Sequence, residues 1–491
     1  MTTIMARRQI CGGWVVGLAL LNCALAAPLR AAPTTRPAHT PFVTVLLRNW
    51  DQWDTNHDGV LSIAEIDRAV LDPSVKGDDA AAAGTLKLLS RSTKITVPPL
   101  TRDYFLDYDQ KAISRLPRIT AAAAETATAN TVASRVPTTG PSVGTKAMPI
   151  RWDVYFMAGQ KRIARGGPTT WPAKPSLDNM RQGPLGDCFL VAPIGSMLVH
   201  RPADIDQIIK RTDDGGYRVK FPAVEPFTLR PLTESELVLS STSSGDGVWL
   251  AALEQAVGRY DEKLKASSDE EGTDIISGGG RVASTMSLLT GHRCKSIRFA
   301  TTAQRREENE AKILPSLREE LVSALHDGRL IAANVTPPVL NPTTRPTTGP
   351  VVASAVVPAV VPTVVPATQP SQSTLATTAG PTTAPTTRPT GRTVLTAAML
   401  PKIPPNITTK HSYAVVAYDP ATDVVEIWNP HGQTFTPKGA AGLENGYQTI
   451  HGRFHLPLSE AYRFFTSFVF ETSAPATQPT TAPAGSPRVG Q

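Results

Sequence analysis

A cysteine, a histidine and an asparagine stand in this chain in an order and in local contexts that suit covalent acyl-transfer chemistry. Cys188 directly follows Gly186-Asp187 and precedes an apolar run, which predicts that the cysteine begins a helix. The unpaired N–H groups and the positive dipole at a helix start favour a thiolate, and with a nearby imidazolium they can lower a cysteine pKa from about 8.5 to roughly 3.5–7.5. We therefore take Cys188 as the candidate nucleophile and Gln182, six residues upstream, as a candidate oxyanion donor.

His411 and Asn429 are predicted to meet across a β-hairpin far downstream of the cysteine. Residues 411–418 read as a strand that begins with the histidine, and residues 424–430 as the returning strand. A hairpin folded about residues 420–421 brings position 411 opposite position 429, give or take two positions. The asparagine carbonyl can then accept the imidazole N–H and fix its tautomer, while the imidazole takes the thiol proton.

The chain around the cysteine resembles the active-site segment of the calpain family of papain-like cysteine proteases. That family has the pattern Gln-Gly-x-Leu-Gly-Asp-Cys-Trp-Leu-Leu-Ala-Ala, and this chain reads Gln182-Gly183-Pro184-Leu185-Gly186-Asp187-Cys188-Phe189-Leu190-Val191-Ala192. The order cysteine, histidine, asparagine and the ending Asn429-Pro430-His431-Gly432 are also similar to the family's. Further similar segments are Trp249–Ala256 with Tyr260, Ser277-Gly278-Gly279 and Gly452–Leu458. The resemblance extends over most of residues 149–473.

This resemblance implies an α+β fold of the papain-like, calpain type, in which a helical subdomain carries the cysteine and an antiparallel β subdomain carries the histidine and the asparagine. It implies that Cys188 is the nucleophile, His411 the base and then the acid, Asn429 the residue that orients the imidazole, and Gln182 the oxyanion donor. The implied reaction is the hydrolysis of peptide bonds in proteins or peptides through an acyl-thioester.

Three residues depart from the family pattern. Phe189 stands where the family has tryptophan after the cysteine, His431 replaces the tryptophan of Asn-Pro-Trp-Gly, and Pro193 replaces an alanine inside the cysteine's helix, where it removes a backbone donor and should kink the helix. These departures leave open a catalytically degenerate, calcium-dependent binding module. The same triad can also pass its acyl group to an amine, so a papain-like acyl transferase is a further alternative.

A second motif lies ahead of this region and has the pattern of an EF-hand calcium loop. Oxygen-bearing side chains occupy positions 1, 3, 5 and 9, a glycine stands at position 6 and a glutamate closes at position 12, as calcium coordination requires. The predicted calcium ligands are Asp54, Asn56, Asp58, the Val60 carbonyl, Ser62 and Glu65. Helices are expected at 42–53 and 63–71, within a small all-α region over 41–118. A degenerate partner loop is expected at 107–113, with Ile113 beside Leu61.

Regular elements are expected between these motifs where hydrophobic periodicity is strongest. The helices expected in the protease-like region are 188–200, Trp249–Tyr260 and Pro315–Asp327, and the strands are Arg329–Val335, Ser412–Tyr418 and Val424–Trp428.

Segments rich in threonine, proline and alanine divide the chain and cannot bury a core. They predict linkers at 28–40 and 119–148, an insertion at 336–396 within a catalytic domain spanning 149–473, and a tail at 474–491. Residues 1–27 contain arginines, then a short apolar core, and then small residues. This order predicts a secretory signal and an exported protein rather than a stable membrane span.

Composition excludes several classes of protein. The chain has 491 residues, a formal net charge of +7 and 4 cysteines. Because Cys11 and Cys23 lie in the N-terminal apolar segment, only Cys188 and Cys294 remain, and a disulfide scaffold is excluded. No run pairs basic residues with stacking aromatics, so nucleic-acid binding is not expected. The sequence does not indicate an oligomeric state.

Overall fold

The computed structural model describes residues 38–92, 95–114, 150–166, 175–264, 276–336 and 397–472. The segments 1–27, 119–148 and 474–491 lie outside the described residues, as do all but the edges of 28–40 and 336–396. No helix among the described residues is long and apolar enough to cross a membrane.

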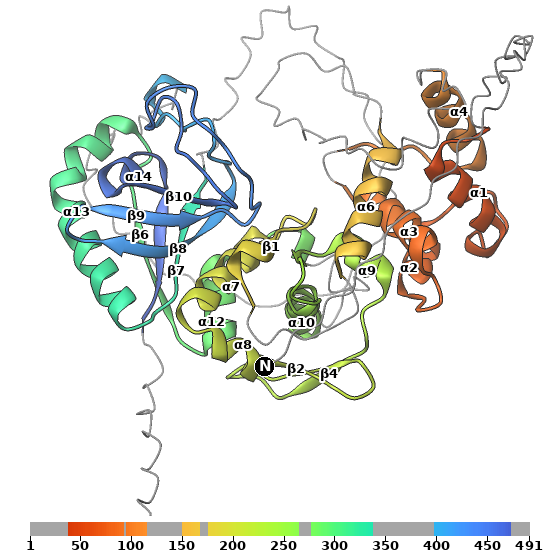
Figure 1. Ribbon diagram of the computed structural model, residues 1–491, viewed down its shortest axis with the longest axis horizontal. Coiled ribbons are helices and arrows are strands. Elements are labelled where there is room, and N and C mark those ends of the chain that lie inside the picture. The colour runs from red at the N-terminus through yellow and green to blue at the C-terminus, as the bar shows by residue number, and fades with distance from the viewer. Residues whose placement is uncertain are drawn as a thin grey trace, which may run out of the picture.

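Two helix–loop–helix units form the N-terminal region, drawn in red and orange in Figure 1. Their helices are α1 (Pro41–Trp53), α2 (Ile63–Leu71), α3 (Gly77–Ser90) and α4 (Arg102–Ile113). The two units are joined between their loops, because the Leu61 N–H donates to the Leu100 carbonyl at 3.0 Å. The prediction that Ile113 pairs with Leu61 is wrong, since residues 107–113 lie within α4 and the partner of Leu61, Leu100, precedes that helix.

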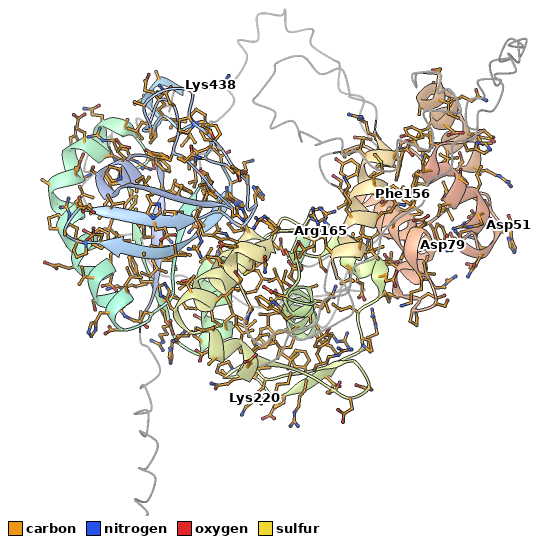
Figure 2. All side chains as sticks on the ribbon, viewed as in Figure 1. Asp51, Asp79, Phe156, Arg165, Lys220 and Lys438 are labelled. Carbon is orange, nitrogen blue, oxygen red and sulfur yellow. The ribbon has the colours of Figure 1, made fainter. Side chains whose placement is uncertain are left out.

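Helix α6 (Trp152–Gly166) completes this N-terminal core. Trp152 stacks on Phe42 of α1 with ring centroids 5.4 Å apart, and Phe156, labelled in Figure 2, is fully buried in the same cluster. The helical region docks on α9 (Glu234–Leu239) of the following unit, where the Thr233 hydroxyl donates to the Val70 carbonyl at 2.7 Å.

Short helices and strands surround the cysteine-bearing helix. They are η1 (Leu177–Asn179), β1 (Met180–Arg181), α7 (Cys188–His200), α8 (Pro202–Ile208), β2 (Ile209–Arg211), β3 (Tyr217–Val219), β4 (Phe227–Leu229), α9, β5 (Thr242–Ser243), α10 (Trp249–Leu264) and α12 (Val282–Thr290). In Figure 1 these elements lie between the N-terminal helices and the large sheet.

The remaining elements build a six-stranded sheet with helices on it. They are β6 (Cys294–Arg298), α13 (Ala303–His326), β7 (Ile331–Val335), η2 (Ala397–Met399), β8 (His411–Asp419), β9 (Val424–Trp428), β10 (Arg453–Pro457), α14 (Leu458–Phe464) and β11 (Ser467–Glu471). The strand order is β10-β9-β8-β7-β11-β6, and every neighbouring pair is antiparallel. Sheet and helices therefore form the α+β arrangement that the sequence predicts.

Successive side chains of each strand point to opposite faces of this sheet, so the buried side chains form one core on each face. Ala332 of β7 packs in the cluster around α7, whereas its neighbours Ile331 and Ala333 pack in the cluster that contains α13 and α14. Helix α7 approaches its face closely because Gly195 lacks a side chain: a Cβ there would lie 2.6 Å from the Trp428 ring. This contact seats the helix of the cysteine against the strands of the histidine and the asparagine.

The predicted elements are confirmed in type, and the ends of helices α10 and α13 and of strands β7 and β8 are shifted. Helix α7 has the predicted bounds and continues with Pro193 inside it, and α10 runs past Tyr260. Helix α13 begins well before Pro315, because Thr302 caps it by accepting the Arg305 N–H, and the proline is accommodated within the helix.

Candidate active site

Cys188 begins α7 at the point where that helix meets strand β8. The side chain is half-buried, and the groups that act on its sulfur are the backbone N–H groups of Ser412 and Phe189 and the Ser412 side chain. Ser412 directly follows His411, the first residue of β8. The fold therefore brings the predicted nucleophile beside the start of the strand that carries the predicted base.

Ser412 is a site residue that the sequence motifs do not indicate. Its hydroxyl donates to Asn334 Oδ1 at 2.8 Å, and the Asn334 amide donates to Ser467 Oγ at 3.1 Å, so the direction of the serine proton is fixed. The sequence signal that could have indicated Ser412 is a polar residue inside an otherwise apolar strand.

His411 and Asn429 are hydrogen-bonded and buried, at 5% and 1% exposure. His411 Nε2 lies 2.9 Å from Asn429 Oδ1, which also accepts the backbone N–H of His431 at 3.0 Å. Because this oxygen is an acceptor in both bonds, the imidazole proton belongs on Nε2. That tautomer leaves a lone pair on Nδ1, which can accept a proton from a thiol.

His431 covers the imidazole in the place where the family pattern has tryptophan. The rings of His411 and His431 stack with centroids 4.2 Å apart and an interplanar angle of 25°. Ala414 of β8 pairs with Trp428 of β9. When this pairing is extended beyond the end of β9, position 431 lies opposite position 411. The hairpin predicts position 429 there, give or take two positions, so the register falls within the predicted range. The imidazole of His431 therefore shields the histidine–asparagine hydrogen bond on one side.

Burial controls the charge of both candidate catalytic groups. Burial raises the pKa of the Cys188 thiol and the Asp187 carboxylate raises it further, although the bonds from Ser412 and Phe189 lower it. Burial and the neighbouring His431 lower the pKa of His411 to about 3, against the opposing effect of the Asn429 bond. The resting pair is a neutral thiol and a neutral imidazole, contrary to the predicted low cysteine pKa, because desolvation outweighs the helix-end donors.

The buried neutral His411 makes the fold sensitive to acid. As the pH falls below about 6.5, the unfolded chain binds a proton at this histidine, whereas the folded chain resists protonation down to pH about 3. We expect the free energy of unfolding to fall by up to about 1.4 kcal/mol per pH unit from this residue between those values.

Urea unfolding of the full chain and of His411→Gln at pH 7, 6, 5 and 4 measures this contribution. Glutamine can still donate to Asn429 but does not titrate, so the pH dependence of the variant should be shallower, and all other groups cancel in the difference. Parallel curves for the two proteins would contradict the assignment.

Gln182 lies in the loop that leads to the cysteine and is tied to both halves of the site. Its backbone N–H donates to the Pro430 carbonyl at 2.8 Å, which links this loop to the Asn429 turn. Its side-chain Nε2 donates to the Leu185 carbonyl at 3.0 Å and to Asp187 Oδ1 at 2.9 Å. Both amide N–H groups are thus used inside the loop, and one must be exchanged before the amide can bind an oxyanion.

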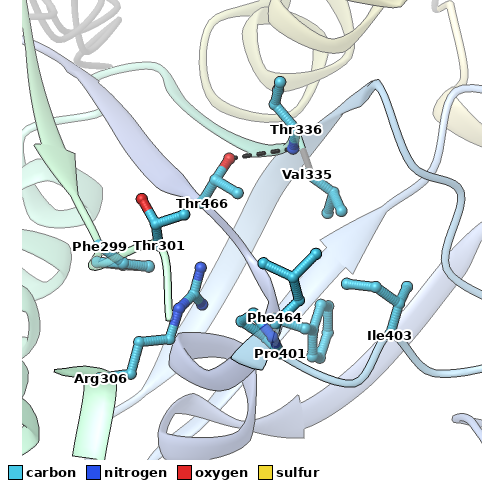
Figure 3. Close-up of a pocket in the computed structure, with 10 residues that line it drawn as sticks. Phe299, Thr301, Arg306, Val335, Thr336, Pro401, Ile403, Phe464 and Thr466 are labelled. Atoms are coloured by element: carbon cyan, nitrogen blue, oxygen red, sulfur yellow. Dashed lines mark hydrogen bonds between the residues drawn. The ribbon is translucent and has the colours of Figure 1, made fainter. Parts of the chain in front are cut away.

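A cavity elsewhere in the sheet region contains none of the predicted catalytic residues. It has a volume of about 370 Å³ and is lined mainly by apolar side chains, with the Arg306 guanidinium at one side (Figure 3). Arg306 donates to the carbonyls of Ala300, Tyr462 and Phe465 at 2.6–2.7 Å. We assign this arginine a structural role, because it satisfies carbonyls at and after the end of α14.

The predicted calcium loop turns sharply at Gly59. Gly59 has a φ of 78°, and its N–H donates to Asp54 Oδ2 at 3.0 Å. Glu65 is occupied by the loop itself, since its two oxygens accept from the N–H groups of Thr55 and Ser62 at 2.9 Å. Asp54 Oδ1 is buried without a hydrogen-bond donor among the described residues.

These contacts decide how calcium would fit the loop. In the part of the chain that the structure describes, no three acidic, histidine or cysteine side chains are placed to hold a metal ion together. The donor types and the unpartnered Asp54 oxygen suit a hard cation, and Glu65 would have to exchange hydrogen bonds for the ion. The bonds that Glu65 accepts hold its pKa at about 2 although burial acts to raise it, so the carboxylate is already ionised at neutral pH.

A family model described as calpain family cysteine protease matches residues 168–440. The match covers more than half of the chain and includes Gln182, Cys188, His411 and Asn429, whereas the loop 54–65 lies outside it. No curated protein matches the chain.

Proposed function

Because this chain belongs to the calpain family of cysteine proteases, we propose that it is an exported, calcium-binding endopeptidase that hydrolyses peptide bonds with Cys188, His411 and Asn429. The observation that carries this proposal is the bond from His411 Nε2 to Asn429 Oδ1 at 2.9 Å, next to a cysteine at a helix start. That bond leaves Nδ1 as the proton acceptor, which is the arrangement a thiol nucleophile requires.

The first half of the reaction makes an acyl-thioester. His411 Nδ1 takes the proton of the Cys188 thiol, and the sulfur attacks the carbonyl carbon of the scissile peptide bond. The C–N bond then breaks, and the amine leaves with the proton that the imidazolium returns. Asn429 keeps the ring in one orientation throughout, because its oxygen accepts the Nε2–H in both charge states.

The second half of the reaction is hydrolysis. His411 takes a proton from water, the hydroxide attacks the thioester carbonyl, and the C–S bond breaks to release the acid and the thiol. The developing oxyanion needs donors, and Gln182 is our candidate side-chain donor. Formation of the thiolate from a buried neutral pair is an uphill step, so we expect substrate binding or a local opening to assist it.

Labelling and product analysis test the proposal. The full chain is incubated with casein, with and without calcium, and then with the epoxide inhibitor E-64. We expect new peptide N-termini in the casein digest and E-64 attached to Cys188, both located by mass spectrometry. Cross-linked products without cleavage would identify an acyl transferase instead, and the absence of both cleavage and labelling would contradict an enzyme.

The raised pKa of Cys188 and the engaged amide of Gln182 favour one alternative, a degenerate family member that binds protein partners without cleaving them. The rate of Cys188 alkylation by iodoacetamide against pH separates the two. A thiol that reacts slowly at every pH up to its own pKa, and that a peptide aldehyde does not protect from alkylation, supports the binding module. Fast, low-pKa reaction supports the peptidase.

Calcium and export form the second part of the proposal. Asp54, Asn56, Asp58, the Val60 carbonyl, Ser62 and Glu65 would hold the ion, which supplies a positive charge that gathers the loop oxygens. Residues 1–27 support export, and an extracellular loop with a dissociation constant of about 10⁻⁴–10⁻³ M would be filled by ambient calcium. We therefore assign the ion a structural role in the N-terminal region rather than a sensing role.

Thermal unfolding with and without calcium tests the loop directly. At 10 mM calcium we expect about 1.5–3 kcal/mol of added stability for the N-terminal region, from the stated affinity range. Glu65→Gln preserves the helix cap but removes the closing carboxylate, so most of the shift should be lost. Glu444→Gln, at an exposed position, is the matched control. An equal shift in the wild type and Glu65→Gln would place the effect of calcium elsewhere.

A further inference from the structure

Two acidic side chains lie in contact directly behind the nucleophile, and the reaction described above uses neither. Asp187 precedes Cys188, and Glu254 is the only charged residue between Trp249 and Val257 of α10. Both carboxyl groups belong to residues with no exposed surface. Because a buried, unpaired carboxylate is strongly unfavourable, such a pair needs a proton or a counter-ion.

The hydrogen bonds around the pair show where the proton must be. Asp187 Oδ1 accepts Gln182 Nε2–H at 2.9 Å, and Glu254 Oε2 accepts the Ser241 N–H at 2.8 Å. The other two oxygens, Asp187 Oδ2 and Glu254 Oε1, are buried and have no donor among the described groups apart from the other acid. Each acid acts on the pKa of the other as a hydrogen-bonding partner does, which places the two side chains within reach of one another. Since two carboxylates cannot share a hydrogen bond, one of them carries a proton.

The surroundings place this proton on Glu254. Burial raises the pKa of Glu254 well above its usual range, and the negative charge of Asp187 raises it further. Burial also raises the pKa of Asp187, but the bonds from Glu254 and Gln182 oppose that effect. The charged and titratable groups that act on the pair are the Arg162 guanidinium of α6, which interacts with Glu254, and the Cys188 thiol.

We propose that Asp187 and Glu254 form a proton-sharing carboxyl pair that positions the Gln182 amide for oxyanion binding next to Cys188. Protonated Glu254 donates to Asp187, and the single charge of the pair stays on Asp187, where it anchors one N–H of Gln182. That bond is charge-assisted, whereas the bond from the same amide to the Leu185 carbonyl is not. An arriving substrate oxygen therefore displaces the Leu185 bond and leaves the Asp187 anchor in place.

The pair also limits the negative charge beside the sulfur. One carboxylate at position 187 already disfavours the Cys188 thiolate, and a second charge on Glu254 would disfavour it more. Glu254 thus has a positioning role through Asp187 and an electrostatic role through its proton. The role of Gln182 rests on the proposed peptidase activity, but the shared proton and its effect on the thiol do not.

Asp187→Asn separates these roles because it should move two readouts in opposite directions. Removing the charge next to Cys188 should speed alkylation by iodoacetamide at pH 7 at least about threefold. Because asparagine offers Gln182 only an uncharged acceptor, the weaker anchor should lower kcat for peptide hydrolysis by about 10- to 100-fold with little change in KM, since the amide acts on the oxyanion. A variant with unchanged kcat and slower alkylation would overturn the proposal.

Variants at Glu254 test the proton. Glu254→Ala leaves Asp187 Oδ2 without a donor and should lose activity, whereas Glu254→Gln supplies an N–H donor and should recover most of that loss. Infrared spectroscopy should show the carbonyl band of a buried protonated acid in the wild type and not in Glu254→Gln, with Glu236→Gln as the matched control. Absence of this band from the folded wild type would overturn the proposed shared proton. This result does not depend on whether the protein cleaves peptides or on whether Asp187→Asn folds.

Discussion

Cys188→Ala should lower kcat/KM for peptide hydrolysis by at least about 10³-fold, because it removes the only proposed nucleophile and no acyl-thioester can form. The change deletes one sulfur atom from a half-buried position at the first turn of α7. The helix should remain, since alanine is a strong helix former and the bonds from Leu190 and Val191 to the Asp187 carbonyl do not involve the side chain. The measurement is steady-state cleavage of a fluorogenic peptide.

Cys294→Ala is the matched control for that experiment. Cys294 is the other cysteine in the described residues, is also half-buried, and begins β6 on the edge of the sheet away from β8. Its loss should change kcat/KM by less than about threefold, the range of an ordinary packing change. Equal activity of wild type and Cys188→Ala would end the peptidase proposal, and equal losses in the two cysteine variants would point to a folding defect.

Local sequence signals predicted the parts of the site that depend on neighbouring residues. The start of α7 follows from a turn and an apolar run around Cys188, and the meeting of His411 with Asn429 follows from one hairpin with a short turn. Both are contacts within a short stretch of chain, where periodicity and turn chemistry decide the geometry. The sheet order could not be obtained in this way, since β11 inserts between β7 and β6 from the far end of the domain.

Burial decided the features that sequence reasoning missed. The helix start at Cys188 suggested a low thiol pKa, but the packing of α7 against β8 removes solvent and reverses the direction. Glu254 was not singled out from the sequence, because only the folded chain shows that it lies beside Asp187. The partner of the calcium loop was misplaced because the bridge from Leu61 is made to Leu100, in the segment between α3 and α4, and no motif at 107–113 indicates this.

His411→Ala should lower kcat/KM nearly as much as Cys188→Ala does, by about 10³-fold or more. The imidazole has two tasks, since it takes the thiol proton and later protonates the leaving amine, and no other described side chain is hydrogen-bonded to Asn429 Oδ1. Asn429→Ala retains the base but frees the ring to rotate, so we expect a loss of about 10²–10⁴-fold. His455→Ala, on the exposed side of β10, is the control and should retain activity.

The double variant Cys188→Ala/His411→Ala distinguishes one catalytic unit from two independent contributors. If the imidazole acts only through the sulfur, its removal costs nothing further once the sulfur is gone, and the double variant should match Cys188→Ala within about threefold. Losses that multiply would show that His411 acts apart from Cys188, which contradicts proton transfer between them. The alkylation rate of Cys188 in His411→Ala gives an independent reading: it should fall, because the base that generates the thiolate is absent.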